Sequence, residues 1–257
     1  MKTGIRSFAF FAIQCVSLCS LVRAEDAEVS APVTRSREVI QVDGRERNYV
    51  ISRPAVIIPG RPYPLVFGFH GYRGEVKAWM YDYTQFDALI LDQHFIVVYP
   101  EGPVSWNSRS DSPDLKFFDQ IVEELAAKFP VDRSRIYAFG HSNGAGFASS
   151  LLFSRKDTVA AVAAYAGIVR MRTAGPDDRK PPLFIVWGEK DEFAPAASDR
   201  VQSSVQAFRN AGYPVTFWAV PNCGHGWGGR EQQMEEKILT FFFKHQLPAQ
   251  ALPQSMP

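Results

Sequence analysis

The amino-acid sequence predicts an α/β protein with a doubly wound, mostly parallel sheet and an antiparallel hairpin at its edge. Three observations support this fold class. Two segments that alternate apolar with polar residues flank an Asp-Gly pair near the N-terminal end, which is typical of a hairpin. The later apolar runs are continuous, as in strands that are buried on both faces of a parallel sheet. These runs alternate with amphipathic stretches of helical period, and that alternation is typical of the α/β class.

The first residues have the features of a secretion signal. Lys2 and Arg6 supply a basic start, and an apolar stretch follows over Phe8–Val22. The small residue Ala24 stands where a signal peptidase cleaves, so residues 1–24 are predicted to be a signal peptide. A membrane anchor is an alternative, although the apolar stretch is short for crossing a bilayer, and lipid attachment at Cys19 is another. Cleavage predicts a secreted or periplasmic protein without membrane contact.

The composition limits the classes of function. The 257 residues are 46% hydrophobic, which is enough for one large domain, and the formal net charge is only +1. Without a basic stripe, nothing indicates a nucleic-acid partner or an anionic membrane surface. Removal of the signal peptide leaves Cys223 as the one cysteine, so no internal disulfide framework is expected. Metal-ligand spacings and glycine-rich phosphate loops are absent from the sequence, so neither a metal nor another cofactor is predicted.

A hairpin is the first predicted element. Residues 25–35 are polar and lack periodicity, so we expect a flexible lead-in to a domain over residues 36–246. Glu38–Val42 and Arg47–Ile51 alternate apolar with polar residues. They flank Asp43-Gly44, a pair that favours a tight turn between antiparallel strands.

Strands and helices are then predicted to alternate. Continuous apolar runs predict buried strands at Leu65–Phe69, Phe95–Tyr99, Ile136–Phe139, Val159–Tyr165, Leu183–Trp187 and Val215–Val220. Helices are predicted where a capping residue begins the segment or where apolar residues recur on one helical face. These segments are Thr84–Asp92, Ser112–Phe129, Ser198–Ala211 and Glu231–His245. Ser112–Phe129 is the clearest helix because Ser112 can cap it, Pro113 suits its first turn and Pro130 ends it. Residues 247–257 are rich in Pro and Gln and are predicted to be a flexible tail.

The stretch Ile136–Ser154 is predicted to carry the reactive group. It reads as an apolar strand, a turn of the form Gly-x-Ser-x-Gly over Gly140–Gly144, and a helix rich in small residues. Such a turn presents a serine with a strained backbone, here Ser142, and its neighbours must lack bulk. A structural turn without chemistry is the alternative. The order of strand, turn and helix favours a nucleophile.

A nucleophilic serine needs a base, and the base needs an acid that orients it. On a sheet of this type the acid and then the histidine follow the serine, each in a loop after a later strand. Of the five histidines, His225 fits, because it follows Val215–Val220 and lies between two glycines. The loop after Leu183–Trp187 offers two carboxylates. Asp191 is preferred because it lies further into the loop, and Glu189 is the reserve.

Acyl transfer to a serine also requires hydrogen-bond donors for the negatively charged oxygen of the intermediate. The N–H of Asn143, directly after the serine, is the first predicted donor. The loop after Leu65–Phe69 is predicted to supply the second, and the N–H of Tyr72 is preferred to that of Gly71. The side chain of His70 is expected to be buried and to hold this loop by a hydrogen bond.

Several short segments of the chain match those of a known enzyme family. They are Arg47-Asn48-Tyr49, Leu65–Gly71, Val98-Tyr99-Pro100, Trp106-Asn107, Phe129-Pro130-Val131-Asp132, Gly140-His141-Ser142-Asn143-Gly144, Trp187-Gly188 through Asp191, and Gly224-His225. From about Arg37 to His245 the chain resembles the secreted esterases of the polyhydroxybutyrate depolymerase and feruloyl esterase group, within the α/β-hydrolase superfamily. The resemblance implies an α/β-hydrolase fold, hydrolysis of carboxylic esters and no cofactor. That family often has paired cysteines near the site, whereas the mature chain has only Cys223.

The link between Val159–Tyr165 and Leu183 is too short for a cap domain, so an open site is predicted. Trp106 and Trp227 are predicted to bind substrate, within a set of aromatic residues on the loops after the strands: Trp79, Tyr81, Tyr83, Trp106, Phe193 and Trp227. An open aromatic cleft favours hydroxycinnamoyl or short-acyl esters, also when they are carried on a polysaccharide or polyester. A polyhydroxyalkanoate depolymerase, a serine peptidase and a non-catalytic binding protein on the same scaffold are the alternatives.

Overall fold

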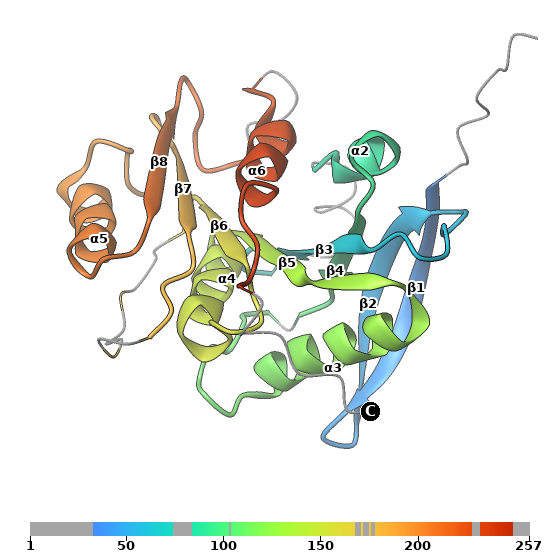
Figure 1. Ribbon diagram of the computed structural model, residues 1–257. Coiled ribbons are helices and arrows are strands. Elements are labelled where there is room, and N and C mark those ends of the chain that lie inside the picture. Colours follow the sequence, from blue (N-terminus) through green and yellow to red (C-terminus); the bar gives the residue numbers. More distant parts are fainter. Residues whose placement is uncertain are drawn as a thin grey trace, which may run out of the picture. The chain divides into compact units, whose positions relative to one another are not determined.

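The computed structural model describes residues 33–73, 84–102, 104–167, 171, 175, 178–227 and 232–248. Within these residues one eight-stranded sheet has the strand order β1-β2-β4-β3-β5-β6-β7-β8 (Figure 1). The strands are β1 Val33–Val42, β2 Arg45–Pro54, β3 Tyr63–Phe69, β4 Ile96–Pro100, β5 Val131–His141, β6 Ala161–Tyr165, β7 Leu183–Gly188 and β8 Val215–Val220. Strand β2 pairs antiparallel with β1 and with β4, and the other neighbouring pairs are parallel. The predicted fold class is confirmed.

The antiparallel edge is the hairpin of β1 and β2. Its turn residues Asp43 and Gly44 have φ of 49° and 74°, so both lie in the left-handed region that a tight hairpin turn requires. The ladder extends as far as the pair Val33 and Pro54. Strand β1 therefore begins inside the segment 25–35 that the sequence predicts as a lead-in, because β2 is long enough to pair with those residues. The predicted signal peptide lies outside the described residues.

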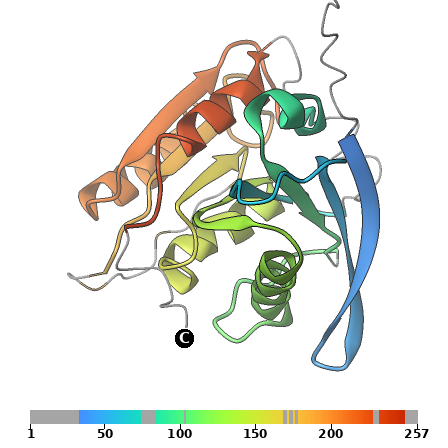
Figure 2. The same ribbon diagram turned by 45° about the vertical axis from the view of Figure 1, so that its right-hand side comes forward.

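Helices cover both faces of the sheet (Figures 1 and 2). Helices α3, α4 and α5 pack on one face and helices α2 and α6 on the other. Their bounds are α2 Phe86–Gln93, α3 Pro113–Lys128, α4 Asn143–Ser154, α5 Asp199–Asn210 and α6 Met234–Phe242. The Ser112 side chain accepts a hydrogen bond from the N–H of Leu115 at 3.2 Å, as predicted for the cap of α3.

The two cores explain why the strand sequences are continuously apolar. In β4, Ile96 and Val98 belong to the core under α3, α4 and α5, whereas Val97 and Tyr99 belong to the opposite core. Successive side chains of a strand point to opposite faces, so a strand covered on both sides has no polar face.

The C-terminal segment is attached to the sheet beyond the last helix. Leu247 is buried, and its N–H donates to the carbonyl of Ser134 at 2.8 Å. The first residue of the predicted tail 247–257 is therefore anchored because its apolar side chain fills part of the core. Residues 249–257 lie outside the described residues.

Candidate active site

The site is built around the turn between β5 and α4. Ser142 has φ of 53° and ψ of −115°, which is a strained conformation for a residue with a side chain. A Cβ atom on Gly140 would lie 2.3 Å from the carbonyl oxygen of Gly144, and one on Gly144 would lie 2.2 Å from that of Phe69. The turn can therefore form only with glycine at both positions. Its strand–turn–helix arrangement is the predicted one.

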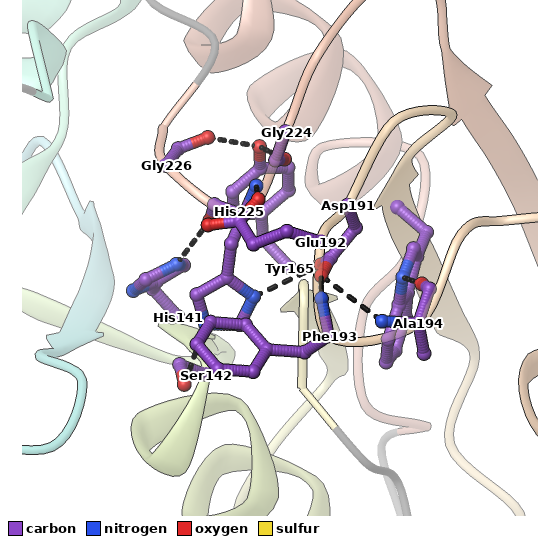
Figure 3. A network of polar contacts seen from close by, with 11 residues as sticks. His141, Ser142, Tyr165, Asp191, Glu192, Phe193, Ala194, Gly224, His225 and Gly226 are labelled. Atoms are coloured by element: carbon purple, nitrogen blue, oxygen red, sulfur yellow. Dashed lines mark hydrogen bonds and ion pairs between the residues drawn. The ribbon is translucent and has the colours of Figure 1, made fainter.

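Three polar side chains from three loops form a chain of hydrogen bonds beside this turn. The Oγ of Ser142 lies 3.0 Å from Nε2 of His225, and Nδ1 of His225 lies 2.9 Å from Oδ2 of Asp191 (Figure 3). An ionised carboxylate can only accept, so it holds the proton on Nδ1 of the neutral imidazole. Nε2 is then the acceptor that faces the serine hydroxyl, which is the arrangement a general base needs.

The surroundings of Asp191 fix its carboxylate. Asp191 is completely buried, and its Oδ1 accepts hydrogen bonds from the N–H groups of Phe193 at 2.9 Å and Ala194 at 3.3 Å. Glu189 is exposed, and its carboxylate accepts instead from the N–H of Asn222 at 3.4 Å. Of the two carboxylates that the sequence leaves open, Asp191 is the one that contacts His225.

Two buried side chains, His141 and Tyr165, hold the loop that carries His225 by hydrogen bonds to its backbone. Nε2 of His141 donates to the carbonyl of His225 at 2.7 Å, and the hydroxyl of Tyr165 donates to the carbonyl of Gly226 (Figure 3). Burial lowers the pKa of His141 from 6.5 to about 4, so this ring is neutral at pH 7. This contact of His141 cannot be read from the sequence, because it depends on how β5 and the loop after β8 meet in space.

Two loops beside the serine carry the predicted oxyanion donors. Asn143 is the first residue of α4, where N–H groups have no acceptor within the helix. Nδ1 of His70 donates to the carbonyl of Gly71 at 2.7 Å, and its Nε2 accepts from the N–H of Gly102 at 3.0 Å. In a trans peptide the N–H of Tyr72 points opposite to the Gly71 carbonyl, and therefore away from His70. The buried, loop-holding role expected of His70 is present, and the two donor assignments stay predictions.

Burial also lowers the pKa of His70. A protonated ring would lose the acceptor at Nε2 that holds Gly102. The neutral form of His70 therefore keeps the loops after β3 and β4 together.

A pocket of about 640 Å³ opens beside Ser142. Its lining residues are Trp106, Ser108, Ser142, Asn143, Gly146, Phe147, Ser150, Ala166, Gly167, Trp187, Phe193, Ala194, Arg200 and His225. Phe193 is 72% exposed, and its ring packs edge-on against His225 with the centroids 4.6 Å apart. The exposed side chains at its edge show that the pocket opens to solvent.

Trp106 lines the pocket, but only 6% of it is exposed, and its predicted role in substrate binding stays a prediction. Its ring stacks on Phe147 with the centroids 5.1 Å apart, and its indole N–H donates to the carbonyl of His70 at 2.9 Å. The ring is therefore mainly a packing element of the pocket lining, rather than an open stacking surface.

Trp227 is not among the residues that line this pocket, and its predicted role in substrate binding stays a prediction. Its indole N–H donates to the buried carboxylate of Glu235 at 2.8 Å, and its ring packs against Phe139 and Tyr165. This residue packs in the core under α6, where a large aromatic side chain gains more from burial than from exposure. The predicted aromatic residues Trp79, Tyr81 and Tyr83 lie outside the described residues.

Two features are absent from the described part of the chain. No group of three His, Cys, Asp or Glu side chains there is arranged to hold a metal ion. The helices of the same residues include none with the length and apolar character that a membrane span needs.

The strand order and the positions of three residues define an α/β-hydrolase fold. The strained serine follows β5, the acid follows β7 and the histidine follows β8. The chain belongs to the dienelactone hydrolase family, whose model matches residues 106–240. This range includes Ser142, Asp191 and His225. The resemblance to the α/β-hydrolase superfamily is confirmed.

Individual relatives include enzymes named for feruloyl esters. Feruloyl esterase D of Neurospora crassa is 24% identical over 159 residues, which cover 57% of this chain and 55% of that protein. A solved ferulic acid esterase has a TM-score of 0.64 at 20% identity, covering 82% of this chain and 97% of that one. An S-formylglutathione hydrolase of Staphylococcus aureus has a TM-score of 0.67 at 12% identity, with 83% and 97% covered. The chain spans about half the length of the curated relatives it matches, or less.

Proposed function

We propose that this protein is a serine esterase that hydrolyses carboxylic esters through an acyl-enzyme. The observation that carries the proposal is the hydrogen-bonded series from Ser142 Oγ through His225 to the buried Asp191, with distances of 3.0 and 2.9 Å. Membership of the dienelactone hydrolase family and the curated feruloyl esterases among its relatives support the same reaction class. A non-catalytic protein has no need of a strained serine hydrogen-bonded to a histidine.

The chemistry follows from the proton positions. Nε2 of His225 takes the hydroxyl proton of Ser142 as Oγ attacks the ester carbonyl, and Asp191 stabilises the imidazolium that forms. The N–H groups of Asn143 and Tyr72 bind the oxyanion of the tetrahedral intermediate. Its collapse breaks the bond to the alcohol oxygen, which receives the proton from Nε2. Water then attacks the acyl-enzyme with His225 again as base, and the acid product and the serine hydroxyl are released.

The pocket suits a hydroxycinnamoyl or short-acyl ester. Its volume of about 640 Å³ accommodates an aromatic acid, and Phe193 presents an exposed ring next to His225. An opening to solvent lets the alcohol half remain outside, so the ester can be carried on a polysaccharide or a polyester. A signal peptide over residues 1–24 would place the enzyme outside the cytoplasm, where such polymers occur.

A substrate panel tests the proposal. We expect the highest kcat/KM for methyl ferulate or a short p-nitrophenyl ester, and lower values for a hydroxybutyrate oligomer and a long-chain p-nitrophenyl ester. The Ser142→Ala variant should stay folded, and its kcat should fall on the order of 10⁴-fold or more. Preference for the amide analogue of the best ester would indicate a peptidase, and preference for the oligomer a polyester depolymerase. Turnover by folded Ser142→Ala within tenfold of the wild type would contradict the proposed mechanism.

A further inference from the structure

Among the described residues that line the pocket, Arg200 is the one side chain with a permanent charge. It lies in the first turn of α5 and is exposed. No ion pair joins it to a carboxylate of the described residues. The described residues of the pocket lining include no carboxylate. Arg200 is therefore a positive charge at the pocket that no described carboxylate holds in an ion pair.

Neither ion pairing nor the stability of α5 accounts for Arg200 at this position. Several other arginines are paired with an acid, as in Arg47 with Asp114 at 2.9 Å and Arg133 with Glu123 at 2.6 Å. A cation in the first turn of a helix opposes the helix dipole, which favours acids there, such as the neighbouring Asp199. Arg200 thus gains neither an ion pair nor a favourable helix position at this place.

We propose that Arg200 binds a carboxylate of the substrate, so that the preferred ester carries one negative charge besides the ester group. The planar guanidinium matches a carboxylate with two parallel hydrogen bonds. A single cation suits a monoanion, whereas a phosphate dianion would keep a second charge that no other described residue of the pocket lining matches with a permanent positive charge. The inference deepens the proposed function and rests on it for the reaction itself.

The loop between β7 and α5 places this charge in the same pocket as the reacting atoms. It carries Asp191, which contacts His225, and then Phe193 and Ala194, which line the pocket ahead of Arg200. We expect a substrate that reaches from Ser142 to Arg200 to contact the lining residues Phe193 and Ala194 of this loop. The carboxylate can belong to either half of the ester, namely to the acyl group or to the alcohol, and the experiment separates these two sources.

Matched pairs of substrates test the inference. In the acyl arm, the mono-4-nitrophenyl ester of pimelic acid is compared with its neutral carboxamide. In the alcohol arm, 3-(acetoxymethyl)benzoate is compared with 3-(acetoxymethyl)benzamide. For wild type we expect a higher kcat/KM for the carboxylate in one of the two arms. The Arg200→Gln variant should reduce this preference about tenfold, mainly through KM, because the charge is bound equally in ground state and transition state.

The control is Arg209→Gln, in the last turn of the same helix and outside the pocket lining. It removes the same charge and should keep the wild-type preference. Added salt should weaken the preference of the wild type, because the site is open to solvent. A preference that changes less than twofold in Arg200→Gln in both arms, or that Arg209→Gln reduces equally, overturns the inference.

A binding measurement separates failure of this inference from failure of the proposed function. In the Ser142→Ala background, calorimetric titration with the four substrates measures affinity without turnover. Carboxylate binding that Arg200→Gln weakens about tenfold supports the inference even if the wild type hydrolyses no ester. Efficient ester hydrolysis combined with binding that does not depend on Arg200 refutes the inference and leaves the esterase proposal intact.

Discussion

Replacing Asp191 by asparagine should stop catalysis without disturbing the shape of the site. Oδ1 of Asp191 accepts from two backbone N–H groups, those of Phe193 and Ala194. In the variant the amide oxygen must take this place, because an NH₂ group there would face two donors. The amide NH₂ is then forced to face Nδ1 of His225 and donates to it.

The consequence is the wrong tautomer of the base. With Nδ1 as acceptor, the neutral imidazole carries its proton on Nε2, which faces the hydroxyl of Ser142 at 3.0 Å and can no longer accept from it. We expect kcat/KM for a short p-nitrophenyl ester to fall on the order of 10⁴-fold. At about 1.4 kcal/mol for each factor of ten, this is a loss of about 5.5 kcal/mol of transition-state stabilisation.

Steady-state kinetics on purified variants checks this expectation, with circular dichroism and thermal unfolding as tests of folding. Glu189→Gln is the matched control, because Glu189 is exposed and its carboxylate accepts a hydrogen bond from the N–H of Asn222 instead of contacting His225. It should remain within about threefold of the wild type, because substitutions at exposed sites away from the chemistry have small effects. Folded Asp191→Asn with activity within tenfold of the wild type, or the reverse ranking of the two variants, would refute the reasoning.

Three further predictions concern packing and pH. Gly144→Ala should lose about 3 kcal/mol or more of unfolding free energy, because the new Cβ would lie 2.2 Å from a backbone oxygen. Gly226→Ala is the control and should keep the wild-type stability, because no atom lies within 4 Å of its new Cβ. Equal melting temperatures of the two variants would contradict the predicted clash. Trp106→Ala should cost about 3–5 kcal/mol of stability by denaturant unfolding, since its ring is 6% exposed; a loss of activity at wild-type stability would instead indicate a binding role. The pKa of His141 is lowered from 6.5 in the unfolded chain to about 4, so its contribution to stability is complete above pH 6.5 and is lost as pH falls toward 4. The wild type should therefore lose up to about 3 kcal/mol more unfolding free energy than His141→Gln when the pH falls from 6.5 to 4, as measured by denaturant titration. The same pH dependence in both proteins would exclude protonation of His141 as the cause.

The turn at Ser142 could be predicted because its sequence constraints are local. The glycines at 140 and 144 are required by contacts of 2.3 and 2.2 Å that any bulkier residue would make. The buried strands could also be predicted from their continuous apolar sequences, because a strand such as Ile96–Pro100 contributes alternate residues to two cores. The order of serine, acid and histidine along the sheet then selected His225 and Asp191.

The parts that sequence reasoning missed depend on distant contacts. Trp227 and Trp106 look alike in the sequence, since both are aromatic residues in loops after strands. The buried carboxylate of Glu235 takes the indole N–H of Trp227 and draws it into the core. The contact of His141 with the carbonyl of His225 joins residues 84 positions apart, and no local pattern announces it.

Arg200 was also missed, although a signal existed. A cation directly after Asp199, in the first turn of a helix, runs against the helix dipole and could have been noted as unexplained by helix stability. Its place in the pocket lining follows from the packing of α5 beside the loop after β7, which the sequence does not show.

The most direct test of the account is covalent labelling of the serine. The wild-type protein is treated with a fluorophosphonate, and the labelled residue is located by mass spectrometry of its peptides. The account predicts a single adduct on Ser142, its absence in Ser142→Ala, and slow labelling in Asp191→Asn, because the nucleophile depends on its base. No adduct on the folded wild-type protein, or an adduct on a different residue, would contradict the claim that Ser142, His225 and Asp191 act as one catalytic unit.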